Sequence, residues 1–219
     1  MLGATAAAIA GSAAGCSAVP FLGSDPIEFE ASRATVPGPV RDDTGYEEHD
    51  VSESVVERTF EAGGETQDVV VTNWQAEYDR AVDLSEVGLP VEERARAAIF
   101  TVLSTPQVSV LDRNFNPVGG MDSAELAEMV QDRYDGVEDV ERVGEDGALV
   151  AGQETTAGEF LTQAELAEAG VTVELILHVT EAVEVGEDFF VTVGGYPRRV
   201  QEAEEDNVFT MMEAVDHQG

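Results

Sequence analysis

Residues 170–197, GVTVELILHVTEAVEVGEDFFVTVGGYP, decide the fold of this chain. Two runs rich in Val, Ile, Leu and Phe flank an acidic segment that contains a Gly, and this pattern indicates two strands joined by a short connection. Within the first run, the apolar residues at 173, 175, 177 and 179 share one face, while His178 lies on the other face with Glu174 and Ile176. Adjacent strands joined so closely are antiparallel, so this stretch predicts two long strands of an antiparallel sheet.

Further strands are predicted before this stretch. They alternate apolar and polar side chains or carry long β-rich runs, and Gly and Pro separate them. Pro106 marks a bend or an edge in one of them, and Pro and Gly break the pattern at 34–45. We interpret GEDG, residues 144–147, as a hairpin turn, because it lacks the spaced oxygen ligands of a calcium loop. The predicted strand segments are 26–32, 46–82 with a hairpin around AGGE, 97–111 and 136–162.

Two segments have the period of a helix. In MDSAELAEMVQDRYDG, residues 121–136, Asp122 can cap a helix and Glu125 follows three residues later, which predicts a capping box. Apolar residues share one face from there until Gly136 ends the pattern. The last segment, residues 199–217, places Val and Met at helical spacing. We therefore predict a central helix at about 122–135 and a C-terminal helix at about 200–216.

These elements predict the α+β class, with a long, mainly antiparallel sheet and two helices. The chain has 219 residues with 43% hydrophobic content, which is enough for one sizeable core. We therefore expect a single domain.

The charge of the chain is its strongest compositional signal. Asp and Glu total 45 against 11 basic residues, all of them Arg, for a formal net charge of −34. Such a charge destabilises a compact chain unless salt screens it, and at molar salt the Debye length falls to roughly 3 Å. Disordered tails, nucleic-acid mimics and cation stores carry acidic residues in blocks or at ligand spacing, whereas here they are interspersed with apolar runs. This composition is typical of proteins from extremely halophilic archaea.

The N-terminal segment resembles a lipoprotein export signal. MLGATAAAIAGSAAGC, residues 1–16, is small and apolar, and Ala13, Ala14 and Gly15 precede Cys16 as in a lipobox, with Ala13 in place of the commoner Leu. Cys16 is then the lipid attachment site. The first basic residue is Arg33, so we expect a signal that begins upstream with an Arg-Arg pair.

The expected organisation is therefore a truncated signal peptide with a lipobox at 1–16, a tether at 17–26 and one domain at 27–219. The expected location is the extracellular face of the cytoplasmic membrane, held by lipid on Cys16. The alternative is a buried cysteine in a cytoplasmic tail, if Met1 is the true start.

Five segments resemble an uncharacterised haloarchaeal lipoprotein family, a domain of unknown function. The resemblance covers nearly the whole mature chain and implies a lipid anchor and a halophilic source, but no activity. The order of a long antiparallel sheet, an inserted helix and a C-terminal helix is also similar to the PsbP-like α/β/α sandwich. The segments that carry the family resemblance are 69–84, 100–118, 152–160, 178–197 and 212–217.

The sequence has few motifs that carry chemistry. It lacks a nucleophile elbow, a zinc-protease helix, a P-loop and a dinucleotide-binding fingerprint. We predict no catalytic residue, metal site or cofactor, and the acidic surface disfavours nucleic acid as a partner. His178 with Glu174 could bind a metal or move a proton, but such a histidine more often packs under a helix.

Two irregular loops are candidate binding segments. LDRNFNPVGGMD, residues 111–122, and GGYPRR, residues 194–199, hold polar and basic side chains in a chain with few cations. The alternative is that both are structural turns whose arginines compensate nearby carboxylates. The candidate residues are Arg113, Asn114, Asn116, Tyr196, Arg198 and Arg199.

Two function classes follow. The first is a lipid-anchored, non-enzymatic module that binds a solute, a cell-wall component or a membrane-protein partner. The second is a hydrolase or metal-assisted enzyme that uses His178 with a carboxylate. The second requires His178 to line a concave pocket with at least two further polar groups. We favour the first.

Overall fold

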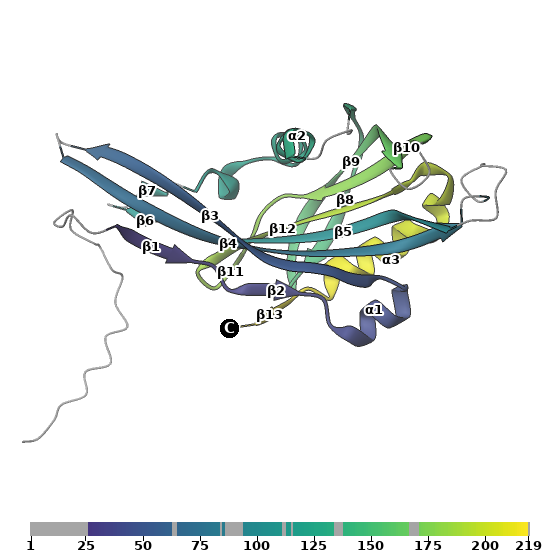
Figure 1. The fold of residues 1–219 in the computed structure, drawn as a ribbon, viewed down its shortest axis with the longest axis horizontal. Helices are drawn as coiled ribbons and strands as arrows, with labels where there is room; N and C mark the ends of the chain where they lie inside the picture. The colour runs from purple at the N-terminus through teal and green to yellow at the C-terminus, as the bar shows by residue number, and fades with distance from the viewer. Residues whose placement is uncertain are drawn as a thin grey trace, which may run out of the picture.

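A computed structural model describes residues 26–62, 65–83, 85, 94–110, 113–114, 116–133, 138–166 and 171–218. Figure 1 shows one large sheet, two small two-stranded sheets and helices packed against the large one. The large sheet contains β1 (Ile27–Glu30), β3 (Glu47–Ala62), β4 (Glu65–Asp83), β5 (Arg94–Pro106), β8 (Glu138–Val150), β9 (Gln153–Leu166), β10 (Val171–Thr180), β11 (Val183–Val185) and β12 (Asp188–Pro197). The small sheets pair β2 (Arg33–Thr35) with β13 (Asp216–Gln218) and β6 (Ser109–Val110) with β7 (Arg113–Asn114). The helices are α1 (Gly38–Thr44), α2 (Ser123–Arg133) and α3 (Gln201–Glu213), with short 3-10 turns η1 (Pro117–Gly120) and η2 (Arg198–Val200).

The nine strands follow the order β1-β4-β5-β12-β10-β9-β8, with β3 on the other edge of β4 and β11 beside β12. β1 runs parallel to β4, and the other pairs are antiparallel. All ten residues of β12 are buried, which is why its apolar run reads almost continuously in the sequence. The two antiparallel strands predicted at 170–197 are present as β10 and β12, and both have a neighbouring strand on each side.

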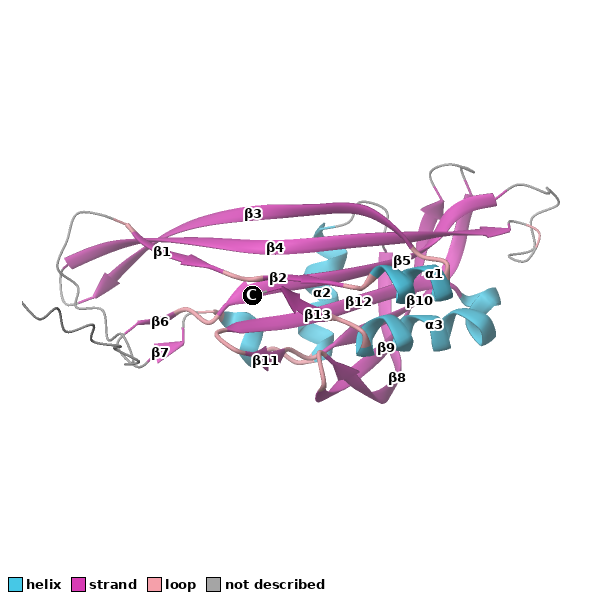
Figure 2. Cartoon of the chain, turned by 90° about the horizontal axis from the view of Figure 1, so that it is seen from below, coloured by secondary structure: helices cyan, strands magenta, loops and turns pink. Residues whose placement is uncertain are grey.

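The hairpin of β3 and β4 forms a long arm. Both strands continue past the end of β5 and β12, and β1 lies along the same end of β4 (Figures 1 and 2). The predicted hairpin around AGGE is confirmed for the strands on either side of residues 63–64, which lie outside the described residues. The arm and β1 thus form one end of the molecule, and α3 lies toward the other end.

Helices cover both faces of the sheet. On one face lie α3, α1, β2 and β13, with α3 in contact with α1, and on the other face α2 packs over β8, β9 and β10 (Figure 2). The core under α3 contains Tyr78, Phe100, Phe190, Tyr196, Val208, Met211 and Met212. The core under α2 contains Leu126, Ala127, Phe160, Leu177, Val179, Val191 and Val193. Alternation along β10 and β12 divides their side chains between these two cores.

The capping box predicted for α2 is present. The Asp122 Oδ1 atom accepts hydrogen bonds from the backbone N–H groups of Ala124 and Glu125, both at 2.9 Å. The Glu125 Oε2 atom accepts the backbone N–H of Asp122 in return, at 3.1 Å. Two unpaired donors of the first turn are thereby satisfied, so this helix begins where its local sequence predicts.

The predicted α+β class is wrong, because the fold is dominated by its sheet. β3 and β4 have 16 and 19 residues, whereas α1, α2 and α3 have 7, 11 and 13. The two predicted helices exist, at Ser123–Arg133 and Gln201–Glu213. The arm strands were predicted at 46–82 and lie at Glu47–Ala62 and Glu65–Asp83, so the error lay in the weight given to the helices, which are short beside nine strands joined in one sheet.

Two local predictions also need correction. Residues 34–45, expected as an irregular break, contain α1, which has a Pro in its first turn and ends at Gly45 in the left-handed conformation, with φ 77°.

GEDG at 144–147 is not the hairpin turn, because it lies inside β8. The turn falls at Ala151 and Gly152, which have φ angles of 50° and 76°. This pair provides the positive φ angles that a tight hairpin requires.

Candidate functional site

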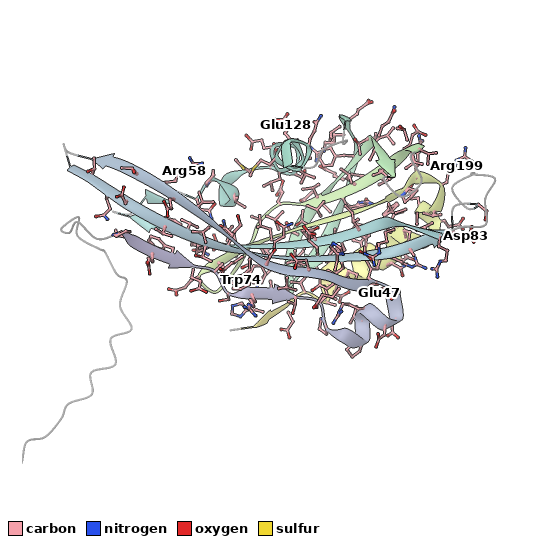
Figure 3. The ribbon with its side chains drawn as sticks, in the orientation of Figure 1. Glu47, Arg58, Trp74, Asp83, Glu128 and Arg199 are labelled. Atoms are coloured by element: carbon pink, nitrogen blue, oxygen red, sulfur yellow. The ribbon has the colours of Figure 1, made fainter. Side chains whose placement is uncertain are left out.

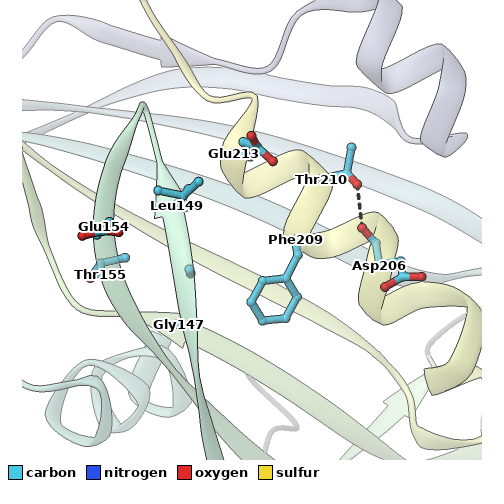
Figure 4. A pocket seen from close by; sticks show the side chains of 9 residues that line it. Gly147, Leu149, Glu154, Thr155, Asp206, Phe209, Thr210 and Glu213 are labelled. Atoms are coloured by element: carbon cyan, nitrogen blue, oxygen red, sulfur yellow. Dashed lines mark hydrogen bonds between the residues drawn. The ribbon is translucent and has the colours of Figure 1, made fainter.

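A groove runs between α3 and the hairpin of β8 and β9, and we call it the α3 groove. It is an open cavity of about 790 Å³ (Figure 4). Its lining residues are Gly147, Ala148, Leu149, Glu154, Thr155, Asp206, Phe209, Thr210 and Glu213.

The wall from α3 follows from helical spacing. Val208, Met211 and Met212 are fully buried against the sheet, which fixes the rotation of the helix. Asp206, Thr210 and Glu213 then share a neighbouring stripe, because residues three and four apart lie above one another. The ring of Phe209 lies between α3 and β8 (Figure 4). Helical spacing thus places the Phe209 ring between the carboxylates of Asp206 and Glu213.

The electrostatics of the α3 groove favour a cation. Glu154 lies on the strand wall, and Asp206 and Glu213 lie on the helix wall, whereas none of the nine described lining residues is basic. The Thr210 hydroxyl donates to the backbone carbonyl of Asp206 at 2.7 Å, so it is held within the helix. Leu149 remains 39% exposed and adds apolar surface. Carboxylates around exposed apolar surface can bind an organic cation with an apolar part.

His178 lies in the core behind this groove. Its ring has no exposed surface and packs edge-to-face against Phe209, with ring centroids 5.2 Å apart. Its Nε2 atom is 2.7 Å from the Tyr196 hydroxyl. Burial lowers the pKa of His178 to about 4, so the imidazole is neutral at pH 7. Burial also raises the pKa of Tyr196, and the nearby carboxylates of Glu205, Glu159 and Asp146 raise it further.

Glu159 faces the same side of the sheet as His178 and lies directly opposite it in the ladder of β9 and β10. Its Oε1 atom accepts a hydrogen bond from Gln201 Nε2 at 3.2 Å, and the same nitrogen lies 3.4 Å from Glu205 Oε2. Glu174, the predicted partner of His178, instead lies at the surface, with its Oε1 atom 3.6 Å from Arg198 Nη1. The partner across the ladder was missed because strand register is not visible in the sequence.

The condition set for an enzyme based on His178 is not met. A histidine without exposed surface does not line a concave pocket, and its hydrogen bond in the structure is to Tyr196 alone. In the described part of the chain, no three His, Cys, Asp or Glu side chains gather to hold a metal ion.

The two candidate loops do not form one site. Asn116 caps η1, and its Nδ2 atom donates to Thr105 Oγ1 and to the Pro106 carbonyl, both at 2.8 Å. Arg113 and Asn114 form β7, and their side chains lie outside the described residues.

The second loop lies elsewhere. Tyr196 is in the core, whereas Arg198 and Arg199 are exposed in η2. Figure 3 shows Arg199 at the end of the molecule opposite the arm that carries Arg58, and β7 lies at the arm end in the same view.

A cluster of arginines that was not predicted lies where β4 ends and β5 begins. The Asp79 Oδ2 atom lies 3.2 Å from Arg96 Nη1 and 3.3 Å from His49 Nδ1. Arg80 pairs with Glu204 of α3, and Arg41 lies 3.6 Å from Glu48. These arginines neutralise carboxylates within the fold. Their clustering depends on strand pairing, although the repeated Arg in RARA at 94–97 was a signal.

Cys16 and the tether lie outside the described residues. None of the helices in the described ranges has the length and apolar character needed to cross a bilayer.

Two solved structures are similar to this chain at low identity. One is a protein of unknown function from Pseudomonas aeruginosa, with 11% identity, a TM-score of 0.39, and coverage of 74% of this chain and 98% of that one. The other is cyanobacterial PsbP from Synechocystis sp. PCC 6803, with 12% identity, a TM-score of 0.39, and coverage of 91% and 100%. No curated protein matches the sequence.

A protein family described as a domain of unknown function, DUF6517, matches residues 33–216. This match spans β2 through α3, ends at the first residue of β13 and includes every residue of the α3 groove. The chain therefore belongs to the DUF6517 family.

Proposed function

We propose that this protein is a lipid-anchored, non-enzymatic binding module on the outer face of the cytoplasmic membrane of a halophilic archaeon. The observation that carries the binding role is the α3 groove, an open cavity of about 790 Å³ with carboxylates on both walls and the Phe209 ring between them. Its volume lies within the range of small-molecule sites.

The ligand class follows from the lining of the groove. The Glu154, Asp206 and Glu213 carboxylates favour a positive charge, and Phe209 can hold a cation against its ring face. At molar salt the attraction between exposed charges is screened, whereas burial of apolar surface is not weakened. An organic cation with an apolar chain therefore suits this groove better than an inorganic ion.

The anchor would present the groove away from the membrane. Cys16 precedes a tether at 17–26, whose ten residues span at most roughly 35 Å. The tether leads into β1, at the arm end, and α3 lies at the opposite end of the molecule (Figure 1). A ligand from the cell exterior can then reach the groove while lipid on Cys16 holds the arm end near the bilayer.

The anchor is tested in a halophilic host that expresses the gene with its native upstream sequence. We expect the wild-type protein to partition with membranes and to carry added lipid mass. Cys16→Ser should be released or remain unprocessed, because it lacks the thiol that accepts the lipid. Equal partitioning of the two forms contradicts the anchor.

The groove is tested by calorimetry in molar KCl with n-butylammonium as the probe. We expect binding by the wild-type protein and at least a fivefold loss in Asp206→Asn/Glu213→Gln, which removes two charges from the helix wall. The matched control is Glu202→Gln, on an exposed position of the same helix that does not line the groove. Butyrate should not bind. Equal affinity in all variants, or no binding by the wild type, contradicts the proposed site.

A further inference from the structure

The α3 groove has an unused hydrogen-bonding group behind its aromatic wall. The Nδ1 atom of His178 has no hydrogen-bond partner, although the side chain is fully buried. An unpaired buried polar atom is costly, so a native protein rarely keeps one without a reason. The imidazole lies against Phe209, which itself lines the groove.

The protonation states of His178 and Tyr196 determine whether the Nδ1 atom of His178 is a hydrogen-bond donor or an acceptor. Burial raises the pKa of Tyr196, so its phenol keeps its proton, and the hydroxyl lies 2.7 Å from His178 Nε2. If Nε2 carried the proton and the hydroxyl accepted it, the phenol proton and Nδ1 would both lack partners, whereas a phenol that donates to Nε2 leaves only Nδ1 unpaired. We therefore assign the phenol as the donor to Nε2. A neutral imidazole carries one proton, which must then reside on Nδ1. Nδ1 is thus an N–H donor that lacks an acceptor.

We propose that the α3 groove extends behind Phe209 to His178, and that its ligand is an organic cation that also carries a carbonyl oxygen. The carbonyl oxygen accepts the Nδ1 proton of His178, and the cationic group lies among the carboxylates of Asp206 and Glu213. Phe209 is half-buried and lines the open groove, and the proposed contact requires its ring to turn aside and uncover the imidazole. This inference rests on the proposed binding function and adds a second contact to it.

The test compares two probes of similar size. 4-Aminobutanamide has an ammonium group and an amide carbonyl, whereas n-butylammonium has the ammonium group alone. The protein variant is His178→Phe/Tyr196→Phe, which removes both polar partners while keeping aromatic volume, so no buried hydroxyl is left unpaired. A thermal melt of each form in molar KCl checks that the fold is retained.

We expect the wild-type protein to bind 4-aminobutanamide about tenfold more tightly than n-butylammonium, which corresponds to one hydrogen bond. The double variant should lose this advantage while its affinity for n-butylammonium stays unchanged. In ¹⁵N spectra, the imidazole signals of His178 should shift with the amide probe only, and those of His217 should not shift.

The outcomes separate the two proposals. If the wild-type protein binds n-butylammonium as tightly as the amide, or if the double variant keeps the preference for the amide, the contact with His178 is overturned. The proposed binding function of the groove then still stands. No binding of either probe by the folded protein overturns both.

Discussion

Glu204 of α3 and Arg80 of β4 form an ion pair beneath the C-terminal helix, although 124 residues separate them in the sequence. Only 3% of the Glu204 side chain is exposed, whereas Arg80 remains 29% exposed. The Tyr46 hydroxyl lies 3.4 Å from the same carboxylate. The helix that carries one wall of the α3 groove is therefore held to the sheet by a buried charge as well as by Met and Val side chains.

Removing one member of this pair should destabilise the fold. Arg80→Met leaves the Glu204 carboxylate buried beside Tyr46 without its cation, and we expect a loss of about 2–3 kcal/mol in the free energy of unfolding. Arg80→Met/Glu204→Met should recover most of this loss. The control is Arg198→Met, because its pair with Glu174 is exposed and worth at most about 1 kcal/mol. Urea titrations in molar KCl provide the measurement, and equal losses in all three variants would contradict the role of the pair.

The contact between α3 and β12 requires a glycine at position 194. A Cβ atom there would lie 2.3 Å from Val208 Cγ1, closer than real side chains approach. We expect Gly194→Ala to push α3 from the sheet and to cost about 1–3 kcal/mol. Gly120→Ala, where a Cβ meets nothing within 4 Å, is the matched control. Thermal melts that do not differ between the two variants argue against this close packing.

The buried imidazole of His178 predicts a pH dependence of stability. Its pKa is lowered from 6.5 to about 4 by burial. Below pH 6.5 the unfolded chain binds a proton that the folded chain excludes, so the free energy of unfolding falls as the pH decreases toward 4. Between pH 6.5 and 5 the loss should be roughly 1.5 kcal/mol. Melts at molar salt should show this slope in the wild type, and His178→Phe/Tyr196→Phe should flatten it. An unchanged slope in the double variant assigns the pH dependence to other groups.

Salt should control the stability of the whole domain. With 45 acidic residues, dilution from molar to about 0.1 M salt lengthens the Debye length from roughly 3 to 10 Å, and carboxylates begin to repel across the surface. We expect the melting temperature of residues 17–219 to fall steeply on dilution at neutral pH. Lowering the pH toward the carboxylate pKa values should partly restore it at low salt. A melting temperature independent of salt would contradict the halophilic interpretation.

The amino-acid sequence by itself determined the elements whose signals are local. Asp122 and Glu125 lie three residues apart, so their capping box begins α2 regardless of the rest of the fold. Alternation placed His178 on the face opposite Leu177, and this face does lie under a helix. The composition predicted dependence on salt, because net charge is a sum over residues and needs no coordinates.

Only the tertiary structure decided which distant residues meet. Glu159 lies opposite His178 because of the register of β9 and β10, and a slip of one residue would move it to the other face. The α3 groove exists because Val208 and Met212 fix the rotation of a helix over a sheet edge formed 50 or more residues earlier. The sheet dominates the class because charged residues on the β3–β4 arm face solvent while the backbone continues to pair. The strands of the arm were predicted at 46–82, but the joining of nine strands into one sheet depends on pairs between segments distant in the chain, such as β5 with β12, and neighbouring residues do not reveal those pairs.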